Sequence, residues 1–147
     1  MSKTSLIIHI VFGTKRRKSS IDVDRKRELY AYIHGIIKKK DCVTIRSNGV
    51  SDHTHILIDL HPSVAVADLV KAVKQSTANW LKVNPIFPNF DGWARGYYAA
   101  SVDHTRLLQV KNYIINQEKH HLATSFLEEI EMSVKEVGME YREDDWQ

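Results

Sequence analysis

The first apolar segment of the chain alternates between two faces. Strongly β-prone residues follow one another over Thr4–Phe12, and successive side chains of a strand point to opposite sides. One face would carry Leu6, Ile8, Ile10 and Phe12, and the other Ile7, His9 and Val11. This pattern predicts a strand that can bury side chains on both of its faces.

Apolar residues at helical spacing predict the helices. The first would run from Asp22, a good capping residue, to about Lys40, and the second over Ser63–Lys82. Asp103 would cap a third helix that reaches about His121. Ser125 with Glu128 forms a capping-box pattern, which predicts the start of a final helix.

Three further strands fit between these helices. Cys42–Arg46 and His53–Leu60 are predicted to form a hairpin, with Asn48-Gly49 as its turn. Tyr97–Val102 would be the last strand. The order predicts an α+β fold of the ferredoxin-like, split βαβ type. Helices would cover one face of the antiparallel sheet and leave the other free for a site or a partner.

Composition narrows the class of protein. The 147 residues fit one domain, 1–147, and a single cysteine, Cys42, excludes an intrachain disulfide. The longest apolar stretch, Leu6–Phe12, is far shorter than the ~20 residues of a membrane helix. With no signal-peptide core at the start, we expect a cytoplasmic protein without membrane contact.

The charge is divided unevenly along the chain. Residues 1–82 hold 15 Lys and Arg against 7 Asp and Glu (net +8), and residues 83–147 hold 6 against 11 (net −5). The cations cluster at Lys15–Lys18, Arg25–Arg27 and Lys38–Lys40. A solvated surface explains any one such cluster, but together they favour a nucleic-acid partner.

Two patterns could carry chemistry. In His53-Thr54-His55 the imidazoles share one face of a strand, as a metal site requires, although two neighbouring histidines also arise by chance. His9 would face the same side. On the helix that follows Asp103, Tyr113 and Gln117 share a polar stripe. Spacing alone leaves open whether Tyr113 is a nucleophile or a surface tyrosine.

Five segments, taken in their order and spacing, are the most specific feature of the sequence. They are His9-Ile10-Val11-Phe12-Gly13-Thr14-Lys15-Arg16-Arg17, Ser51-Asp52-His53-Thr54-His55-Ile56-Leu57-Ile58, Val66-Ala67-Asp68-Leu69-Val70-Lys71, Trp93-Ala94-Arg95-Gly96-Tyr97 and Tyr113-Ile114-Ile115-Asn116-Gln117. Together they resemble the single-tyrosine transposases of the insertion sequence 200/605 type, within the His-hydrophobic-His superfamily of single-strand endonucleases. The resemblance covers nearly the whole chain.

The resemblance implies a role for each matching residue. His53, His55 and Gln117 would bind Mg²⁺ or Mn²⁺, and Tyr113 would be the nucleophile. Thr54 stands where the family has a bulky hydrophobic residue. Because Thr54 would face the core, we expect this departure to affect packing and to leave the metal site intact.

The resemblance also implies a substrate and an assembly. Tyr113 would attack single-stranded DNA at hairpin-containing ends and form a 5′-phosphotyrosine, and the chain would act as a homodimer. Transesterification conserves the phosphodiester, which agrees with the absence of a phosphate-binding loop motif. The candidates for DNA-backbone contacts are Lys15, Arg16, Arg17, Lys71 and Lys74.

Rival functions stay open at this point. One is a non-catalytic nucleic-acid-binding module, because the ferredoxin-like fold hosts many functions. Others are a replication-initiator or relaxase nickase, and a host-adapted, repeat-associated tyrosine transposase. Metal-dependent covalent capture of an oligonucleotide separates the enzymes from the binding module.

Overall fold

The structure, a computed structural model, describes residues 2–120, 125–140 and 142. Its centre is an antiparallel sheet in the order β2-β3-β1-β4. The strands are β1 (Ile7–Gly13), β2 (Val43–Val50), β3 (His53–Asp59) and β4 (Tyr98–Ser101). The first and third strands are therefore central, as the ferredoxin-like prediction requires.

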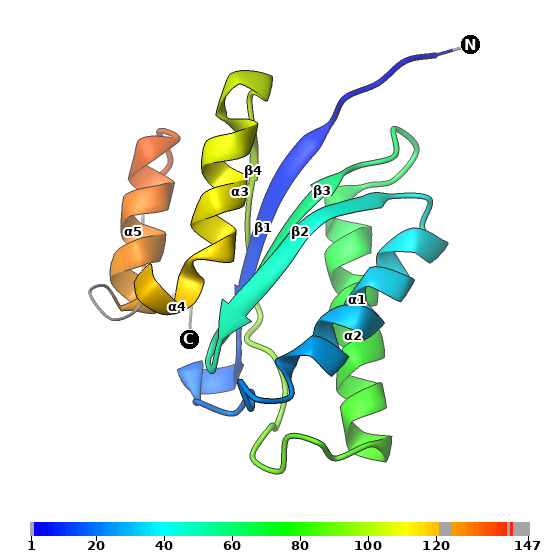
Figure 1. The fold of residues 1–147 in the computed structure, drawn as a ribbon, viewed down its shortest axis with the longest axis vertical. Coiled ribbons are helices and arrows are strands. Elements are labelled where there is room, and N and C mark those ends of the chain that lie inside the picture. The colour runs from blue at the N-terminus through cyan, green and yellow to red at the C-terminus, as the bar shows by residue number, and fades with distance from the viewer. Residues whose placement is uncertain (1, 121–124, 141, 143–147) are drawn as a thin grey trace.

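Helices lie on both faces of this sheet (Figure 1). One layer consists of α1 (Lys26–Lys39) and α2 (Val66–Val83). The other consists of α3 (Leu107–Ile115), the short α4 (Gln117–His120) and α5 (Phe126–Glu136). Short 3-10 turns, Lys15–Arg17 and His104–Arg106, follow β1 and precede α3. The prediction that the second face stays free is wrong, because α3 and α5 cover it.

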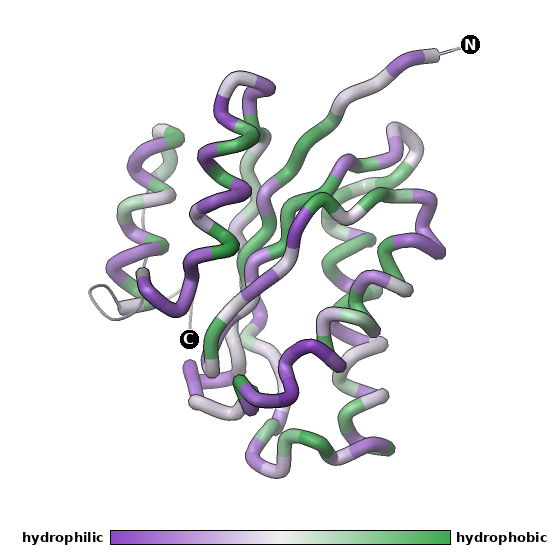
Figure 2. Tube along the Cα trace, viewed as in Figure 1, coloured by the Kyte–Doolittle hydropathy of each residue, from purple (hydrophilic) through white to green (hydrophobic). Residues whose placement is uncertain are grey.

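Alternation along the central strands supplies a core on each side. Toward α1 and α2, β1 and β3 direct the fully or almost fully buried Ile10, Phe12, Ile56 and Ile58. Toward α3 and α5 they direct Ile7, Val11 and Leu57. Burying an aliphatic side chain of this size contributes about 1.5–3 kcal/mol. The apolar segments of β1 and β3 accordingly run between the helical layers (Figure 2).

Two predicted boundaries change in the structure. The helix expected from Asp22 begins at Lys26, because Asp22 instead accepts a hydrogen bond from the backbone N–H of Asp24 (2.9 Å). The helix expected from Asp103 is interrupted at Asn116, and its first residues form a 3-10 turn that the Asp103 carboxylate caps. Among the described residues no helix is long and apolar enough to cross a membrane.

The predicted Asn48-Gly49 turn is also wrong. Both residues lie inside β2, paired with His55 and Thr54, and the chain reverses at Ser51-Asp52 instead. Gly49 is needed here for space. A Cβ on it would overlap the carbonyl oxygen of His53 and the hydroxyl of Tyr30.

We therefore expect Gly49→Ala to destabilise the fold by about 3 kcal/mol, the upper range for overpacking a filled core. Gly35→Ala is the matched control, because a Cβ at this position of α1 meets nothing within 4 Å. It should raise stability by up to about 1 kcal/mol through helix propensity. Urea denaturation of both variants measures the difference. Equal stabilities would contradict the close contact at Gly49.

Candidate active site

Two histidines of β3 form the floor of the candidate site. His53 and His55 point to the face covered by α3 and α5, and both are almost fully buried (0% and 1% exposed). Thr54 points to the other face, where its hydroxyl lies 3.4 Å from that of Tyr30 on α1. The two-residue period of the strand therefore placed these three side chains correctly.

Neighbouring side chains orient both imidazoles. Nδ1 of His53 donates to the Asp52 carboxylate (2.7 Å), and Nδ1 of His55 lies 2.9 Å from Nε2 of His9. The ring of Phe126 stacks on His53, with centroids 4.2 Å apart. In both histidines Nδ1 thus has a hydrogen-bond partner and Nε2 faces the centre of the site. Metal-binding histidines are commonly oriented in this way by a hydrogen bond to the other ring nitrogen.

Charge on these imidazoles follows their surroundings. Burial, together with the neighbouring His55, lowers the pKa of His9 to about 3, so His9 is neutral. Burial also opposes protonation of His53, but the Asp52 and Glu129 carboxylates outweigh it and raise the pKa of His53. His9 faces the same side as the pair, as its position in β1 predicted.

Tyr113 and Gln117 reach the site from a segment that β2 and α1 hold in place. Asn48 of β2 donates its amide protons to the carbonyls of Ile114 and Ile115 (3.0 and 3.1 Å), where α3 ends. Lys26 of α1 pairs with Glu118 and donates to a carbonyl of β2. The break at Asn116 turns Gln117 inward, where it is fully buried with Oε1 3.4 Å from Nε2 of His53.

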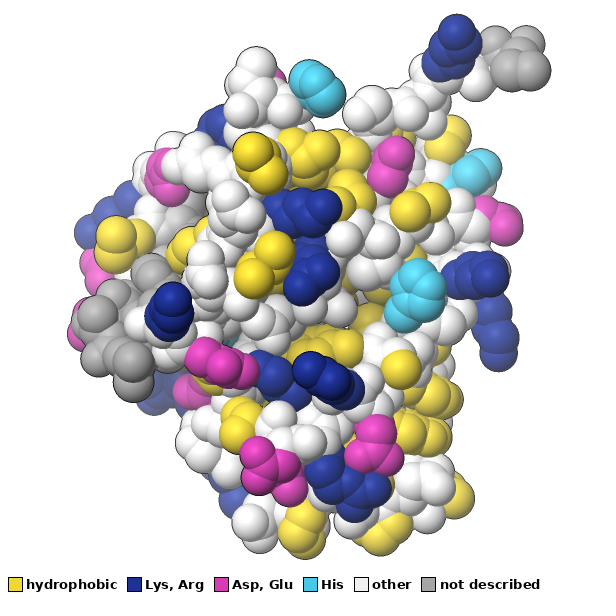
Figure 3. Space-filling view, viewed as in Figure 1, with side chains coloured by type: hydrophobic (Ala, Val, Ile, Leu, Met, Phe, Trp, Pro, Cys, Tyr) yellow, Lys and Arg dark blue, Asp and Glu magenta, His cyan; other side chains and the backbone are white. Residues whose placement is uncertain are grey.

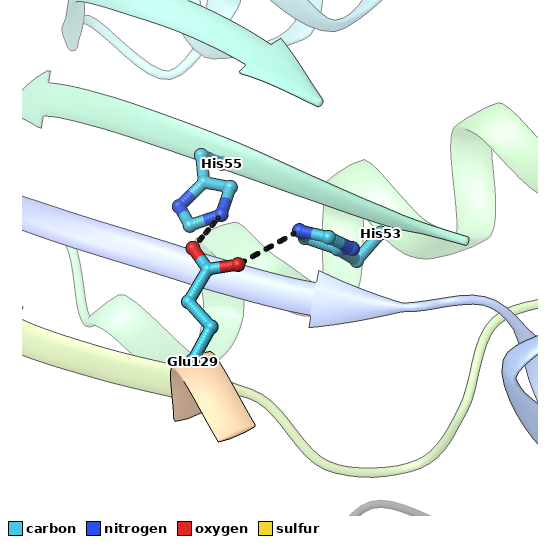
Figure 4. A group of neighbouring side chains, drawn as sticks. All are labelled: His53, His55 and Glu129. Atoms are coloured by element: carbon cyan, nitrogen blue, oxygen red, sulfur yellow. Dashed lines mark ion pairs between the residues drawn. The ribbon is translucent and has the colours of Figure 1, made fainter. Parts of the chain in front are cut away.

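One acidic residue of the site, Glu129, was not predicted from the sequence. Glu129 lies on α5, which begins after Ser125 as predicted, and its carboxylate is only 2% exposed. It lies 2.9 Å from Nε2 of His55 and 3.5 Å from Nε2 of His53 (Figure 4). Tyr113 donates its hydroxyl proton to the same carboxylate, and the amide of Gln117 lies 3.4 Å from it.

A signal for Glu129 does exist in the sequence. Phe126 and Ile130, three residues before it and one after, lie on the apolar side of α5 and are buried. A charged residue at that position of a helix must find a buried partner, because an unpaired buried carboxylate is costly. Here its partners are histidines that come from a strand more than seventy residues earlier.

His53, His55 and Glu129 together suit a divalent cation. One ligand atom from each lies within 4.8 Å of the others, and all three side chains are buried. Two imidazoles and one carboxylate are typical ligands of first-row divalent metals. The cation would also offset the buried charge of Glu129. Gln117 borders this set, so the structure brings the predicted ligands together with one more.

The position of Glu129 also affects Tyr113. Burial, with the nearby carboxylate, raises the pKa of Tyr113 above its usual range. The phenol is therefore protonated at neutral pH in the arrangement described. Within this chain the Tyr113 ring lies beside the histidines, with its centroid 5.7 Å from that of His55.

The basic loop lies next to this cluster. Lys15, Arg16 and Arg17 are exposed, and the loop is anchored where Thr14 and Lys15 donate backbone hydrogen bonds to the carbonyls of Asp52 and Gly92 (both 2.9 Å). Arg16 and Arg17 both take left-handed backbone conformations, with φ of 55°. The loop thus presents its cations from a fixed backbone, beside the strand end that carries His53.

The two lysines predicted on α2 differ from each other. Lys71 is exposed, whereas the ammonium of Lys74 donates to the carbonyls of Ala94, Arg95 and Gly96 (2.8, 3.1 and 2.9 Å). Partial burial lowers the pKa of Lys74 to about 8. Since its three N–H groups are directed to carbonyls, Lys74 ties the loop of residues 94–96 to α2.

A further group of cations lies on the face that carries β2 and the start of α1 (Figure 3). Lys26, Arg27 and Arg46 line a hollow there, and Glu118 contributes the one carboxylate among its lining residues. Tyr30 and Asn48 also border this hollow.

One family of known proteins matches most of this chain. The family described as "Transposase IS200 like" matches residues 2–117, a range that includes the histidine pair, Tyr113 and Gln117 but ends before α5. The transposases for insertion sequence element IS200 of Salmonella typhimurium and Salmonella typhi are each 23% identical over 114 residues, 74% of both chains.

Two solved structures share the fold. A putative transposase from Deinococcus radiodurans R1 has a TM-score of 0.62 at 23% identity, covering 79% of this chain and 93% of its own. A REP-associated tyrosine transposase bound to a REP hairpin has a TM-score of 0.62 at 13% identity, covering 82% and 74%. With a family match over most of its length, this chain belongs to the IS200-like transposases, a family of DNA-processing enzymes.

Proposed function

We propose that the protein cleaves and rejoins single-stranded DNA at hairpin-containing ends, with Tyr113 as the nucleophile. One observation carries the proposal. The Tyr113 hydroxyl, Gln117 and the histidine pair all converge on the Glu129 carboxylate in one buried cluster. A tyrosine with a purely structural role would not need two imidazoles, an amide and a carboxylate around its hydroxyl.

The proposed step exchanges one phosphoester bond for another. The Tyr113 oxygen bonds to phosphorus while the bond from phosphorus to the 3′ oxygen breaks. The phenol releases one proton to solvent and the departing 3′ oxygen takes one up from solvent. The strand on the 3′ side stays attached to Tyr113 through its 5′ phosphate, and an incoming 3′-hydroxyl reverses the step. No energy source is consumed, because the phosphodiester is conserved.

His53, His55 and Glu129 would hold the divalent ion, Mg²⁺ or Mn²⁺, with Gln117 as a neighbouring ligand. Once bound, the ion would polarise a phosphate oxygen and stabilise the charge that develops at phosphorus. Asp52 and His9 keep the two imidazoles in the orientation that directs Nε2 to the centre. Asn48 keeps the Tyr113 segment beside them.

A hairpin substrate and a homodimer belong to the same proposal. The family match and the solved relative bound to a REP hairpin support a DNA hairpin as the partner. Incubation with candidate hairpin strands and Mn²⁺ tests the activity, with a denaturation-resistant protein–DNA adduct as the expected result. Sedimentation of the protein with and without hairpin tests the dimer.

The basic loop is expected to dominate the salt dependence of DNA binding. Arg16→Glu combined with Arg17→Glu should weaken binding, and each lost phosphate contact should lower the salt slope by roughly 0.7. The control is Lys38→Glu combined with Lys39→Glu in the last turn of α1, which changes the net charge by the same amount. Fluorescence anisotropy across a salt series measures both. The same slope in the two variants would show that Arg16 and Arg17 make no phosphate contacts.

A further inference from the structure

A cavity of about 230 Å³ opens beside the nucleophile, between β4, α3 and α5. Its inner end is aromatic, because Tyr98 and Tyr113 both lie edge-on to His9, with centroids 5.7 and 6.5 Å away. Apolar side chains form its walls: Val102, Val110 and Met132. The exposed ion pair of Arg106 and Glu136 (2.8 Å) marks its opening at the surface.

We propose that this cavity binds a nucleobase of the DNA strand, that of the first nucleotide on the 3′ side of the cut. The proposal rests on the proposed cleavage by Tyr113. A pocket of this size is below the range that accepts a whole drug-sized ligand, so it suits a base rather than a nucleotide. Aromatic rings at its inner end offer the stacking surface on which bases bind single-strand-binding proteins.

The charges that line the cavity favour a neutral base over a phosphate. Glu129 lies at the inner end of the cavity and Glu136 at its opening, while Arg106, the one Lys or Arg among the lining residues, is already paired with Glu136. Carboxylates repel a phosphate but accept the amino groups of a neutral base. The scissile phosphate would lie at the Tyr113 hydroxyl, where a bound cation would offset the charge of Glu129. The neutral base would enter the cavity beside it.

Stereochemistry identifies which nucleotide it is. In phosphoryl transfer the attacking and leaving oxygens lie roughly in line, so the 3′-oxygen strand departs on the side of phosphorus opposite Tyr113. The nucleotide joined through its 5′ oxygen remains on the tyrosine. It is this nucleotide, a few bonds from the Tyr113 ring, that can reach a cavity bordered by the same ring.

The test fills the cavity from one wall. Val110→Phe narrows it, and Leu108→Phe is the matched control, because Leu108 lies on the same helix but is 69% exposed. Ser133→Phe fills the cavity from α5 and serves if Val110→Phe unfolds. Each protein is incubated with Mn²⁺ and hairpins flanked by randomised single strands, and the covalently captured strands are sequenced.

Wild type and Leu108→Phe should enrich one base, or one class of base, at the first attached nucleotide by at least about fivefold. Both filled variants should lose this enrichment. An abasic site at that position should slow adduct formation about tenfold in wild type, the effect of losing one base–aromatic stack, and hardly at all in the filled variants. Adducts without base enrichment, or enrichment that survives filling, would overturn the base site while leaving cleavage by Tyr113 intact.

A binding measurement decides the base site without cleavage. A hairpin that carries 2-aminopurine at the same position is titrated into Tyr113→Phe, which keeps the aromatic ring. Its fluorescence should be quenched on binding, and the additional Val110→Phe change should remove this quenching. If wild type forms no adduct with any strand, the proposed function fails. If 2-aminopurine is not quenched on binding, the base site is rejected.

Discussion

Tyr113→Phe is expected to abolish strand cleavage and to leave hairpin binding nearly unchanged. The substitution removes one oxygen, the atom proposed to bond to phosphorus, and keeps the ring that borders His9 and His55. Adduct formation on a hairpin strand with Mn²⁺ should fall to background. Anisotropy with the same strand should give a dissociation constant within about threefold of wild type, because base and backbone contacts remain.

The matched control for this variant is Tyr32→Phe. Tyr32 lies on α1, where its ring stacks on Trp80 with centroids 4.5 Å apart, on the far side of the sheet from the histidines. The Tyr32→Phe variant should cleave the hairpin strand as wild type does. A denaturation-resistant adduct that persists in Tyr113→Phe would assign the nucleophile to another residue.

His55→Ala is expected to lower Mn²⁺ affinity by more than about a hundredfold. Loss of residues that merely orient metal ligands already costs 10–100-fold, and His55 offers a ligand atom itself. Titration calorimetry, or the paramagnetic signal of free Mn²⁺, measures the affinity. His34→Ala is the control, because His34 is exposed on the outer side of α1. Equal affinity in wild type and His55→Ala would remove the metal site.

The same titration ranks the third ligand. Glu129→Gln keeps the size of the side chain and removes its charge, whereas Gln117→Ala removes the amide. Because a carboxylate binds a divalent cation more strongly than a neutral amide, Glu129→Gln should weaken Mn²⁺ binding more than Gln117→Ala. The reverse order would assign the third position to Gln117, the ligand that the family resemblance implies.

The strand pattern of the sequence was sufficient to predict the directions of the β1 and β3 side chains in this site. A period of two residues fixed the common face of His53 and His55, the opposite direction of Thr54 and the side on which His9 lies. These predictions depend only on local geometry, and β3 follows that geometry because it is central and paired on both sides.

The remainder depended on contacts between distant segments. Asn48-Gly49 has the composition of a turn. In the structure Tyr30 packs over Gly49, and the Asn48 amide donates to a carbonyl at the end of α3. These tertiary contacts outweighed the local preference. The interruption at Asn116 and the inward position of Glu129 arise in the same way. No periodicity within α5 could reveal that its buried carboxylate faces histidines of β3.

The Asn48 amide has a consequence for the proposed strand exchange. Asn48 pairs in register with His55 and also holds the end of α3, so the strand position opposite a metal ligand anchors the nucleophile. Detaching the end of α3 from β2 would break two hydrogen bonds, each contributing about 0.5–1.5 kcal/mol, and expose the fully buried Ile114. Under the proposed mechanism, the strand attached to Tyr113 would therefore be held in place while the incoming 3′ end moves.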